Sequence, residues 1–330
     1  MKFINPDIEI IKQQPGFEGI LKQIEIAGRT CYKSEANITD DSAKKFVNRM
    51  IASKHTSMLE HGTLYLDIPL GNLGDDREYM WKSNIIQIFK KNPYSRVNKY
   101  KKEHNIDDKT TISVDHYAIT TNYRVFIEQI NWDELGPMRR EKLHGWELGL
   151  DKEYVLSFMC EPGDHHDKRI TIKMFTDRGV SAEANRHRAD SPAEQSTRYC
   201  NYSKGKFGNE ITFIQPCNID EGTKEYDIWY NCMKNIEDAY MEMSELNCFP
   251  DQLRMLLPHS TAAELCMTAN IREWRHILEL RASKYAHPSV QQIMIPILKY
   301  FQKEMPELFN DIEYNDEFDE NKYAELKVID

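Results

Sequence analysis

The sequence predicts a protein of the α+β class. In some segments apolar residues recur every three or four positions, which is the period of a helix, and in others they alternate with polar residues, which is the period of a strand. The two kinds of segment follow one another irregularly, whereas a parallel βαβ array would alternate them regularly. The chain has 330 residues, 40% hydrophobic and 29% charged, so it is long enough to bury a core and is typical of a soluble globular protein.

The first half of the chain carries one clear helix and one clear strand. Residues 40–54 predict a helix with an apolar face made of Ala43, Phe46, Val47, Met50 and Ile51. Residues 63–68 predict a strand. From 71 to about 110 the chain is rich in charge, Asn and Lys, so we expect an irregular insertion around a short element at 92–97. Residues 122–132 predict another helix.

The second half predicts three strands, at 153–160, 169–175 and 210–214, and three helices, at 179–187, 222–247 and 287–309. The strand at 169–175 has the clearest pattern, because Ile170, Ile172 and Met174 alternate with polar residues, as a half-buried strand requires. Beyond the last helix, six acidic residues among the ten at 311–320 predict a mobile tail or a peripheral arm.

Composition excludes several classes of protein. The formal net charge of -10 argues against a surface that tracks nucleic acid, since such binding needs a basic face. The seven cysteines are scattered and never form a C-x-x-C pair, which disfavours a disulfide framework and a zinc site. The N-terminus lacks the apolar run of a signal peptide and no stretch approaches a membrane span, so we expect a cytoplasmic protein without membrane association.

Cationic side chains gather in one short segment. Arg186, His187 and Arg188 are followed, after seven residues, by Ser196, and Arg198 comes two positions later. Planar guanidinium groups match the geometry of phosphate and carboxylate and stay charged at any relevant pH. In an acidic protein, this segment predicts a site for a small phosphorylated ligand.

A predicted helix at 269–283 presents cations on two faces. Arg281 ends an apolar stripe, whereas Arg272 and His276 form a second group about half a revolution away from it. Either Arg281 extends along the apolar surface and Arg272 is simply solvated, or the helix offers cations to two ligands or two subunits. The cationic segment at 186–198 favours the second interpretation.

These residues together resemble the flavin-dependent thymidylate synthases. The signature of that family is Arg-His-Arg, seven residues and Ser, which residues 186–196 satisfy. Three further blocks are similar, in the right order: the upstream flavin segment at 55–61, the substrate-arginine segment at 254–258, and the downstream helix with Asn270, Arg272, His276 and Arg281. The blocks cover about residues 28 to 295.

The resemblance implies the fold of that family, with a central, mostly antiparallel sheet flanked by helices and a helical C-terminal part. It implies a single catalytic domain over residues 1–310, with insertions at about 71–110 and 135–168, followed by an acidic C-terminal tail at 311–330. It also implies a homotetramer whose active sites are assembled from several subunits, which the two-faced helix suits.

The resemblance further implies an FAD site. Its residues are His55, Ser57, Glu60, Arg186, His187, Arg188, Asn270, Arg272 and His276. Because the chain has no G-x-G-x-x-G motif and no P-loop, side chains rather than a glycine-rich turn must hold the dinucleotide. Taken alone, His55 is interpreted equally well as an ordinary buried histidine.

The nucleotide substrate implied by the resemblance is deoxyuridine monophosphate (dUMP). Its residues are Glu183, Glu194, Ser196, Arg198, Arg254 and Arg281. We expect Arg198 and Arg254 to hold the phosphate and Arg281 to stabilise negative charge on the uracil ring during catalysis. Ser196, the second catalytic candidate, is expected to orient the substrate through a hydrogen bond, and the nearby thiol of Cys200 to pack rather than react.

The implied reaction is the methylation of dUMP to thymidine monophosphate (dTMP) without a covalent cysteine. Such enzymes take the carbon from 5,10-methylenetetrahydrofolate and let NADPH reduce FAD, which then supplies the hydride. The chain departs from the usual pattern at Ala182, Ala184, Asn185 and Asp190. Asp190 could compete for Arg188, so these changes put affinity and rate in question.

Two other interpretations of the same residues stay open. The chain could be a homologue that binds flavin and nucleotide without catalysis, or a nucleic-acid-binding module in which the arginines act with Tyr199 and Tyr202. The acidic net charge counts against the second. A cluster at 160–167, which includes adjacent histidines, could suggest a metal, but such loops are more often solvent-exposed, and we expect no metal site.

Overall fold

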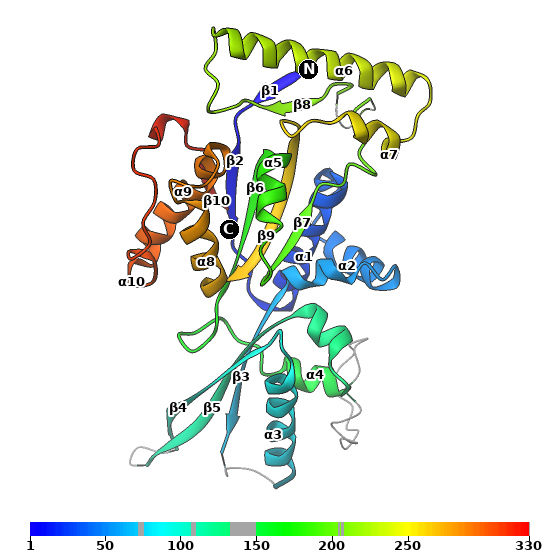
Figure 1. Ribbon diagram of the computed structural model, residues 1–330. Coiled ribbons are helices and arrows are strands. Elements are labelled where there is room, and N and C mark those ends of the chain that lie inside the picture. The colour runs from blue at the N-terminus through cyan, green and yellow to red at the C-terminus, as the bar shows by residue number, and fades with distance from the viewer. Residues whose placement is uncertain (72–75, 107–109, 133–149, 204, 206–207, 330) are drawn as a thin grey trace. The chain divides into compact units, whose positions relative to one another are not determined.

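The computed structural model describes residues 1–71, 76–106, 110–132, 150–203, 205 and 208–329 (Figure 1). The chain divides into two compact units. Unit 1 comprises Met1–Lys12, Ile26–Ile38 and Ile170–Asp330, and unit 2 comprises Gln13–Glu25 and Thr39–Arg169. The secondary structure mixes helices and sheets, as the α+β prediction requires. Among the described residues, no helix combines the length and the apolar character needed to cross a membrane.

A five-stranded sheet forms the centre of unit 1, in the order β10-β2-β6-β9-β7. Its strands are β2 (Asp7–Ile11), β6 (Arg169–Asp177), β7 (Asp190–Glu194), β9 (Ala262–Asn270) and β10 (Glu325–Ile329). β2 is antiparallel to β6 and β7 is antiparallel to β9, whereas β10 pairs with β2 in parallel.

Helices cover this sheet and complete the main core of unit 1. They are α5 (Arg178–Ala184), α8 (Ile271–Arg281), α9 (Pro288–Glu304) and α10 (Pro306–Phe309). Trp274 of α8 is completely buried, packs against Phe301 of α9 with ring centroids 6.1 Å apart, and donates its indole N–H to the carbonyl oxygen of Ile170 at 3.0 Å. Trp274 therefore links α8, the helix that carries Arg281, to strand β6.

A second, smaller layer of unit 1 joins the N-terminus to the middle of the chain. β1 (Lys2–Ile4) pairs in parallel with β8 (Thr212–Ile214), and α6 (Lys224–Glu245) packs beside them. α7 (Pro250–Leu253) and a 3-10 turn (Arg254–Leu256) follow. Phe213 and Tyr240 are the largest side chains that this layer buries completely.

Unit 2 is built on a three-stranded antiparallel sheet in the order β3-β5-β4. Its elements are β3 (Thr63–Leu70), β4 (Arg96–Asn105), β5 (Thr111–Asn122), α2 (Ser42–Ala52), α3 (Asp76–Lys91), α4 (Leu150–Leu156) and the turns Thr56–His61 and Val125–Gln129. One face of the sheet packs on α3 through an apolar cluster that includes Leu66, Ile119 and Phe89. α1 (Gly16–Tyr32) belongs to both units, since the division falls after Glu25.

The periodic segments form the elements that the sequence predicts, within a few residues at each end. The helices predicted at 40–54, 179–187 and 222–247 are α2, α5 and α6, and the strands predicted at 63–68 and 169–175 are β3 and β6. The strand predicted at 210–214 is β8, and the helix predicted at 269–283 is α8. The helix predicted at 287–309 is divided into α9 and α10, because Met305 adopts a non-helical conformation with φ -140° before Pro306.

Two predictions in unit 2 are wrong, and one predicted helix is shorter than expected. The irregular insertion expected from 71 to about 110 contains the regular elements α3 and β4, although its residues 72–75 and 107–109 lie outside the described part. Of the strand expected at 153–160, residues 153–156 instead form the end of α4, and Met159 makes an isolated β-bridge with Leu66. The helix expected at 122–132 is present but shorter, because β5 continues to Asn122: residues 123 and 124 are helical and the π-helix Val125–Gln129 follows. Part of the second expected insertion, at 135–168, lies within residues 133–149, which are outside the described residues.

The acidic C-terminal segment is folded rather than a mobile tail. Ile312 and Ala324 are buried, and β10 extends the central sheet by pairing with β2 from Glu325↔Asp7 to Ile329↔Ile11. The acidic residues that suggested a tail occupy the turns before this strand, whereas Tyr314, Phe318 and Tyr323 pack against the core. The assignment of residues 1–310 to one catalytic domain stays a prediction.

Candidate functional site

A cleft of about 1040 Å³ lies in unit 1 between the segment after α5 and the outer side of α8. It is lined by Glu183, Arg186, His187, Arg188, Ala189, Glu273, His276, Glu279, Leu280, Arg281, Ser283, Tyr285, Ala286 and His287. The cationic segment and the cationic helix, about ninety residues apart in sequence, therefore meet at one cleft.

Helix capping positions both sides of this cleft. α5 begins where Asp177 accepts a hydrogen bond from the backbone N–H of Val180 at 2.7 Å, and it ends at Ala184. The chain then enters the Arg186–Arg188 turn before β7 begins. α8 begins where Asn270 Oδ1 accepts from the N–H of Glu273 at 2.8 Å, so the predicted flavin ligand Asn270 also caps a helix.

Arg281 makes three contacts with the segment after α5. Its Nη1 forms an ion pair with Glu183 Oε2 at 2.5 Å, its Nη2 donates to the carbonyl oxygen of Glu183 at 2.9 Å, and its Nε donates to His187 Nε2 at 3.2 Å. The guanidinium is thus held at the last turn of α8, with its position set by the chain that carries the Arg-His-Arg motif.

His187 is neutral at physiological pH. Burial, and then the charges of Arg281, His276 and Arg186, lower its pKa from 6.5 to about 4. Its side chain is only 4% exposed, and Nδ1 lies 3.8 Å from Glu273 Oε1. Because Nε2 accepts from Arg281, the neutral ring carries its hydrogen on Nδ1, toward that carboxylate.

This pKa predicts a specific loss of stability in acid. Between pH 6.5 and about 4 the unfolded chain binds a proton at His187 that the folded chain does not bind, so the free energy of unfolding falls as the pH falls through this window. His187→Asn, which cannot titrate, should lose less stability than the wild type between the two ends of the window. Urea unfolding of the flavin-free proteins measures the difference, and equal losses would contradict it.

Glu194 and Ser196 are not among the residues that line this cleft. Glu194 accepts hydrogen bonds from Ser181 Oγ at 2.6 Å and Asn185 Nδ2 at 3.0 Å, and lies 3.3 Å from Arg178 Nη1. In the described part of the chain, the hydrogen bond recorded at Ser196 Oγ is from the N–H of Arg198, at 3.4 Å. The N–H of Arg198 is a hydrogen-bond donor, so this contact supplies no base that would make Ser196 a nucleophile.

The two arginines expected to hold the phosphate, Arg198 and Arg254, are not part of this cleft. Both are exposed. The Arg198 guanidinium lies 5.8 Å from the ring of Tyr199, and Arg254 lies in the 3-10 turn after α7. Of the predicted dUMP residues, the structure therefore brings only Glu183 and Arg281 into the cleft lining.

The predicted FAD residues fall into three groups. Arg186, His187, Arg188 and His276 line the cleft. Asn270 and the exposed Arg272 start α8. His55, Ser57 and Glu60 belong to unit 2, where His55 and Ser57 are exposed, not buried, and Glu60 pairs with Arg124 Nη1 at 2.5 Å.

A buried ion network supports the segment that carries Ser196, and sequence reasoning missed it. Glu264 of β9 is 1% exposed, forms an ion pair with Lys33, and contacts Lys173 Nζ at 2.9 Å. The carbonyl oxygen of Glu264 accepts from the N–H of Gln195 at 2.8 Å, and the N–H of Ser196 donates to the carbonyl oxygen of Cys31 at 2.9 Å. No local pattern marks this network, because its members lie far apart in sequence.

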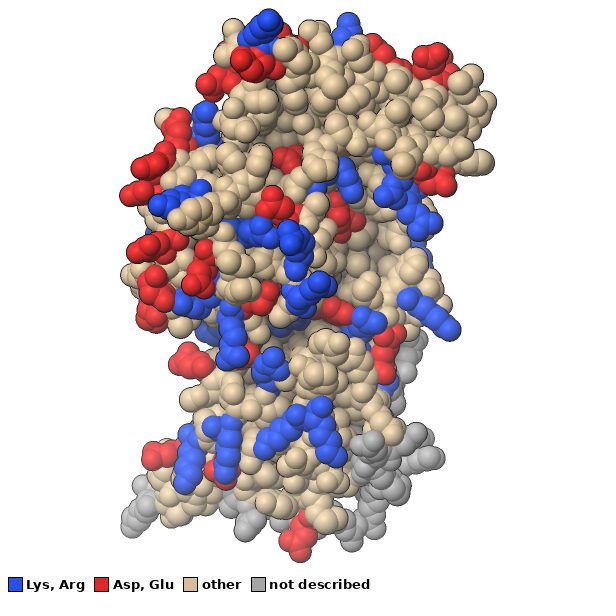
Figure 2. Space-filling view, viewed as in Figure 1, with Lys and Arg blue, Asp and Glu red and all other residues tan. Residues whose placement is uncertain are grey.

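In the upper part of Figure 2, over the sheet and helices of unit 1, basic side chains lie among acidic ones. Binding along a nucleic acid depends on a row of cations that neutralises successive phosphates. This face therefore favours a small-ligand cleft over a nucleic-acid-binding surface.

A family model described as thymidylate synthase complementing protein matches residues 164–307. Through this segment, less than half of its length, the chain is similar to the thymidylate synthase complementing proteins. The match contains the Arg186–Ser196 motif and α8, so the family segment carries the described cleft. Residues 39–163, most of unit 2, lie outside the match.

Curated relatives of this family share low identity with the chain. The flavin-dependent thymidylate synthase of Thermococcus onnurineus is 25% identical over 162 residues, which cover 49% of this chain and 65% of the relative. That of Geobacter sulfurreducens is 24% identical over 200 residues, covering 59% and 80%, and that of Thermococcus kodakarensis is 29% identical over 172 residues, covering 52% and 69%. The chain thus spans less than two thirds of the length of the first of these relatives.

Proposed function

We propose that this chain is an FAD-dependent thymidylate synthase that converts dUMP to dTMP. The carbon donor is 5,10-methylenetetrahydrofolate, and NADPH reduces the FAD. The observation that carries the proposal is the meeting of Arg186, His187, Arg188, His276 and Arg281 at one cleft of about 1040 Å³. The names of the similar proteins, flavin-dependent thymidylate synthases, support it.

The donor set of the cleft fits a flavin dinucleotide. Exposed guanidinium groups at Arg186 and Arg188 suit a pyrophosphate, and a volume of about 1040 Å³ is at the upper end of ordinary ligand pockets. The neutral ring of His187 adds no positive charge of its own but fixes the position of Arg281. When bound, FAD would supply a hydride and accept one from NADPH.

The protein groups would act on the pyrimidine by charge. As C5 of the uracil ring attacks the incoming carbon, negative charge builds on the ring, and the guanidinium of Arg281 would stabilise it. Glu183 would hold this guanidinium in place through the ion pair already present at 2.5 Å. Ser196 would orient the nucleotide by a hydrogen bond.

The thiols of this region support a route without a cysteine nucleophile. Burial raises the pKa of both Cys31 and Cys266 to about 12, so neither is a thiolate at neutral pH. Cys200 is buried as well. The proposed reaction needs no such nucleophile, because hydride from the flavin completes the methyl group.

The proposed enzyme has the family fold with a central, mostly antiparallel sheet, and works as a homotetramer. In this arrangement other subunits bring His55, Ser57, Glu60, Arg198 and Arg254, which do not line the cleft described here, to the shared active sites. Incubation of the purified protein with dUMP, methylenetetrahydrofolate and NADPH tests the proposal. Formation of dTMP supports it, whereas a flavin-bound protein that forms none is the inactive homologue.

Arg186→Ala should release most of the bound flavin. The exposed guanidinium is the first cation of the motif, and its loss removes a charge-assisted contact to the pyrophosphate. The ratio of flavin to protein after gel filtration measures the effect. Lys284→Ala is the matched control, because it removes one exposed cation outside the cleft lining. Equal flavin content in both variants would overturn the assignment of Arg186.

A further inference from the structure

The last turn of α1 lies against the segment that carries Ser196, and both belong to unit 1. The N–H of Ser196 donates to the carbonyl oxygen of Cys31 at 2.9 Å, and the ring of Tyr32 lies 5.8 Å from that of Tyr199. Ser196 in turn begins a tight turn, because its carbonyl oxygen accepts from the N–H of Cys200 at 3.1 Å. The position of Ser196 therefore depends on where α1 ends.

α1 ends in a left-handed turn at Lys33, where φ is +47°. The N–H of Lys33 donates to the carbonyl oxygen of Thr30 at 3.3 Å, and the N–H of Ser34 donates to that of Arg29 at 3.1 Å. Glycine, and sometimes asparagine, usually occupies such a position after a helix, because a larger side chain is strained there. A lysine at this position indicates that its side chain makes a contact that offsets the strain.

That contact is an ion pair between Lys33 and Glu264, a residue of β9 that is 1% exposed. The ammonium group of Lys33 also lies 5.5 Å from the centre of the Phe175 ring. A carboxylate this deeply buried requires a cationic partner, because an uncompensated buried charge is strongly destabilising. The pair therefore ties the residue that follows α1 to the central sheet of unit 1.

Glu264 also contacts the Ser196 segment through its backbone. Its carbonyl oxygen accepts from the N–H of Gln195 at 2.8 Å, one residue beyond the last β7–β9 pair, Glu194↔Leu265. The next N–H along the chain, that of Ser196, is the one that bonds to the end of α1. Glu264 thus fixes residue 195 directly and residue 196 through the helix end that its side chain holds.

A second cation lets the Lys33 contact be removed without leaving Glu264 unpaired. Lys173 Nζ lies 2.9 Å from Oε2 of Glu264 and 3.4 Å from Oε1 of Glu35. When Lys33 is replaced by a neutral residue, Lys173 still compensates the buried carboxylate. We therefore expect such a variant to fold, so that the effect of the Lys33 contact can be measured by itself.

We propose that Lys33 and Glu264 are positioning residues for the nucleotide, because their ion pair holds the end of α1 where it fixes Ser196. The inference rests on the proposed function, in which Ser196 orients dUMP. With the pair intact, the Ser196 segment is in its binding position before the nucleotide arrives. Without the pair, only a fraction of the molecules holds that position, and the apparent affinity for dUMP falls in proportion to that fraction.

Lys33→Asn tests the proposal, because asparagine tolerates the left-handed turn but is too short to replace the ammonium group at Glu264. Hydrogen exchange of the full-length protein should become about tenfold faster at the amide of Ser196. In steady-state kinetics the KM for dUMP should rise by about tenfold while kcat stays within about twofold, because the segment is in place once the nucleotide is bound. A general loss of folded protein would instead lower kcat and leave KM unchanged.

Two further variants make the test specific. Glu264→Gln keeps the shape of the side chain but removes its charge, so it should cause the same changes, and the double variant should be no worse than either single one. Lys173→Met is the matched control. It removes a positive charge from the same carboxylate but leaves the contact with Lys33, so exchange at Ser196 and the KM for dUMP should match those of the wild type.

The proposal is overturned if Lys33→Asn leaves exchange at Ser196 unchanged, or speeds it without raising the KM for dUMP. Equal effects of Lys173→Met and Lys33→Asn would overturn it as well. The exchange measurement requires neither nucleotide nor turnover. A wild-type protein that forms no dTMP would therefore refute the proposed function, whereas exchange in Lys33→Asn would still decide whether the ion pair positions Ser196.

Discussion

Arg281→Ala is expected to lower kcat/KM for dTMP formation by about 10²- to 10³-fold, the usual cost of removing one preorganised group that stabilises developing charge. The guanidinium is held by Glu183 through both its carboxylate and its carbonyl oxygen, and by His187 Nε2. The variant therefore removes the proposed partner of the uracil ring and also frees the segment that carries the Arg-His-Arg motif. Arg281→Lys should recover little of the loss, because an ammonium cannot make these three contacts in one plane.

The matched control for this variant is Arg275→Ala on the same helix. Arg275 pairs with Asp311 through two contacts of 2.7 Å and 2.6 Å on the side of α8 away from the cleft, and does not line the cleft. Arg275→Ala removes the same charge from α8 as Arg281→Ala does. Because Arg275 does not line the cleft, this variant should keep nearly all of the activity. An Arg281→Ala protein that is folded and within threefold of the control would remove Arg281 from the mechanism.

Trp274→Ala is expected to lower the free energy of unfolding by about 3–5 kcal/mol, the range for deletion of a large buried aromatic side chain. Trp274 is completely buried between the sheet and α9, and its indole N–H bonds to the carbonyl oxygen of Ile170 at 3.0 Å. The variant leaves a cavity under α8 and an unpaired carbonyl oxygen. Urea unfolding measures the change.

Trp274→Phe separates packing from hydrogen bonding. It keeps most of the apolar volume but removes the N–H donor, so it should cost less than the alanine variant, on the order of 1–3 kcal/mol. If Trp274→Ala lowers the free energy of unfolding by less than about 1 kcal/mol, the burial of Trp274 in the main core of unit 1 is contradicted.

Local periodicity was sufficient to predict the elements with one strong amphipathic pattern. α2, α6 and α8 each place apolar residues at helical spacing, and β6 alternates apolar and polar residues. Each of these elements packs against the core with one face only, so its apolar residues recur with a period that can be read from the local sequence. The Arg-His-Arg motif was recognisable for a similar reason, because its residues lie close together in the chain.

Elements whose stability depends on distant partners were missed. β4 is polar along most of its length and is held as a strand by its pairing with β5, so its sequence looked like a loop. The residues at 153–156 have the composition of a strand, but packing of Val155 into the unit 2 core favours a helix. β10 follows an acidic stretch, and its pairing with β2 spans more than 300 residues of sequence.

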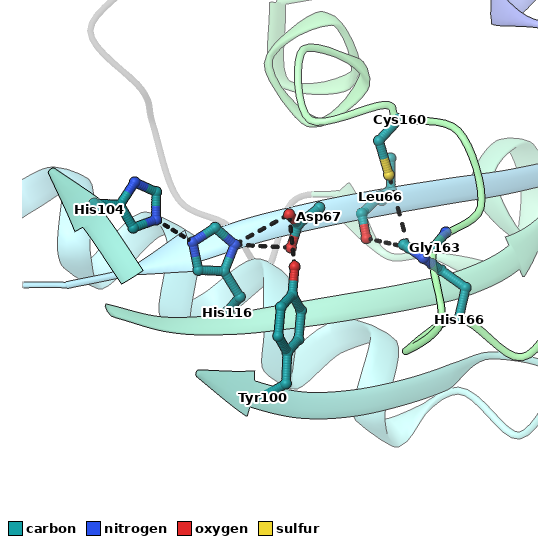
Figure 3. Close-up of polar contacts among 8 residues, drawn as sticks. All are labelled: Leu66, Asp67, Tyr100, His104, His116, Cys160, Gly163 and His166. Atoms are coloured by element: carbon teal, nitrogen blue, oxygen red, sulfur yellow. Dashed lines mark hydrogen bonds and ion pairs between the residues drawn. The ribbon is translucent and has the colours of Figure 1, made fainter. Parts of the chain in front are cut away.

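The same reason limits what sequence reveals about the candidate site. The cations on α8 and after α5 could be proposed as ligands from their residue type, whereas the contacts of Glu183 and His187 with Arg281 could not be predicted. The support of the Ser196 segment by Glu264 is invisible in sequence, because one ion pair within the network joins residues 231 positions apart. The contacts of Asp67 with His116 and Tyr100 likewise become recognisable only when β3, β4 and β5 are aligned (Figure 3).

The proposed enzyme holds a flavin beside a pyrimidine nucleotide in the cleft of unit 1. The decisive experiment is a titration of dUMP into the FAD-loaded protein, monitored by the visible absorbance of the flavin. We predict a saturable change in the flavin bands with dUMP, absent with adenosine monophosphate and lost in Arg281→Ala but kept in Arg275→Ala. A protein that does not retain FAD, or whose bound flavin spectrum is unchanged at any dUMP concentration, would contradict the account.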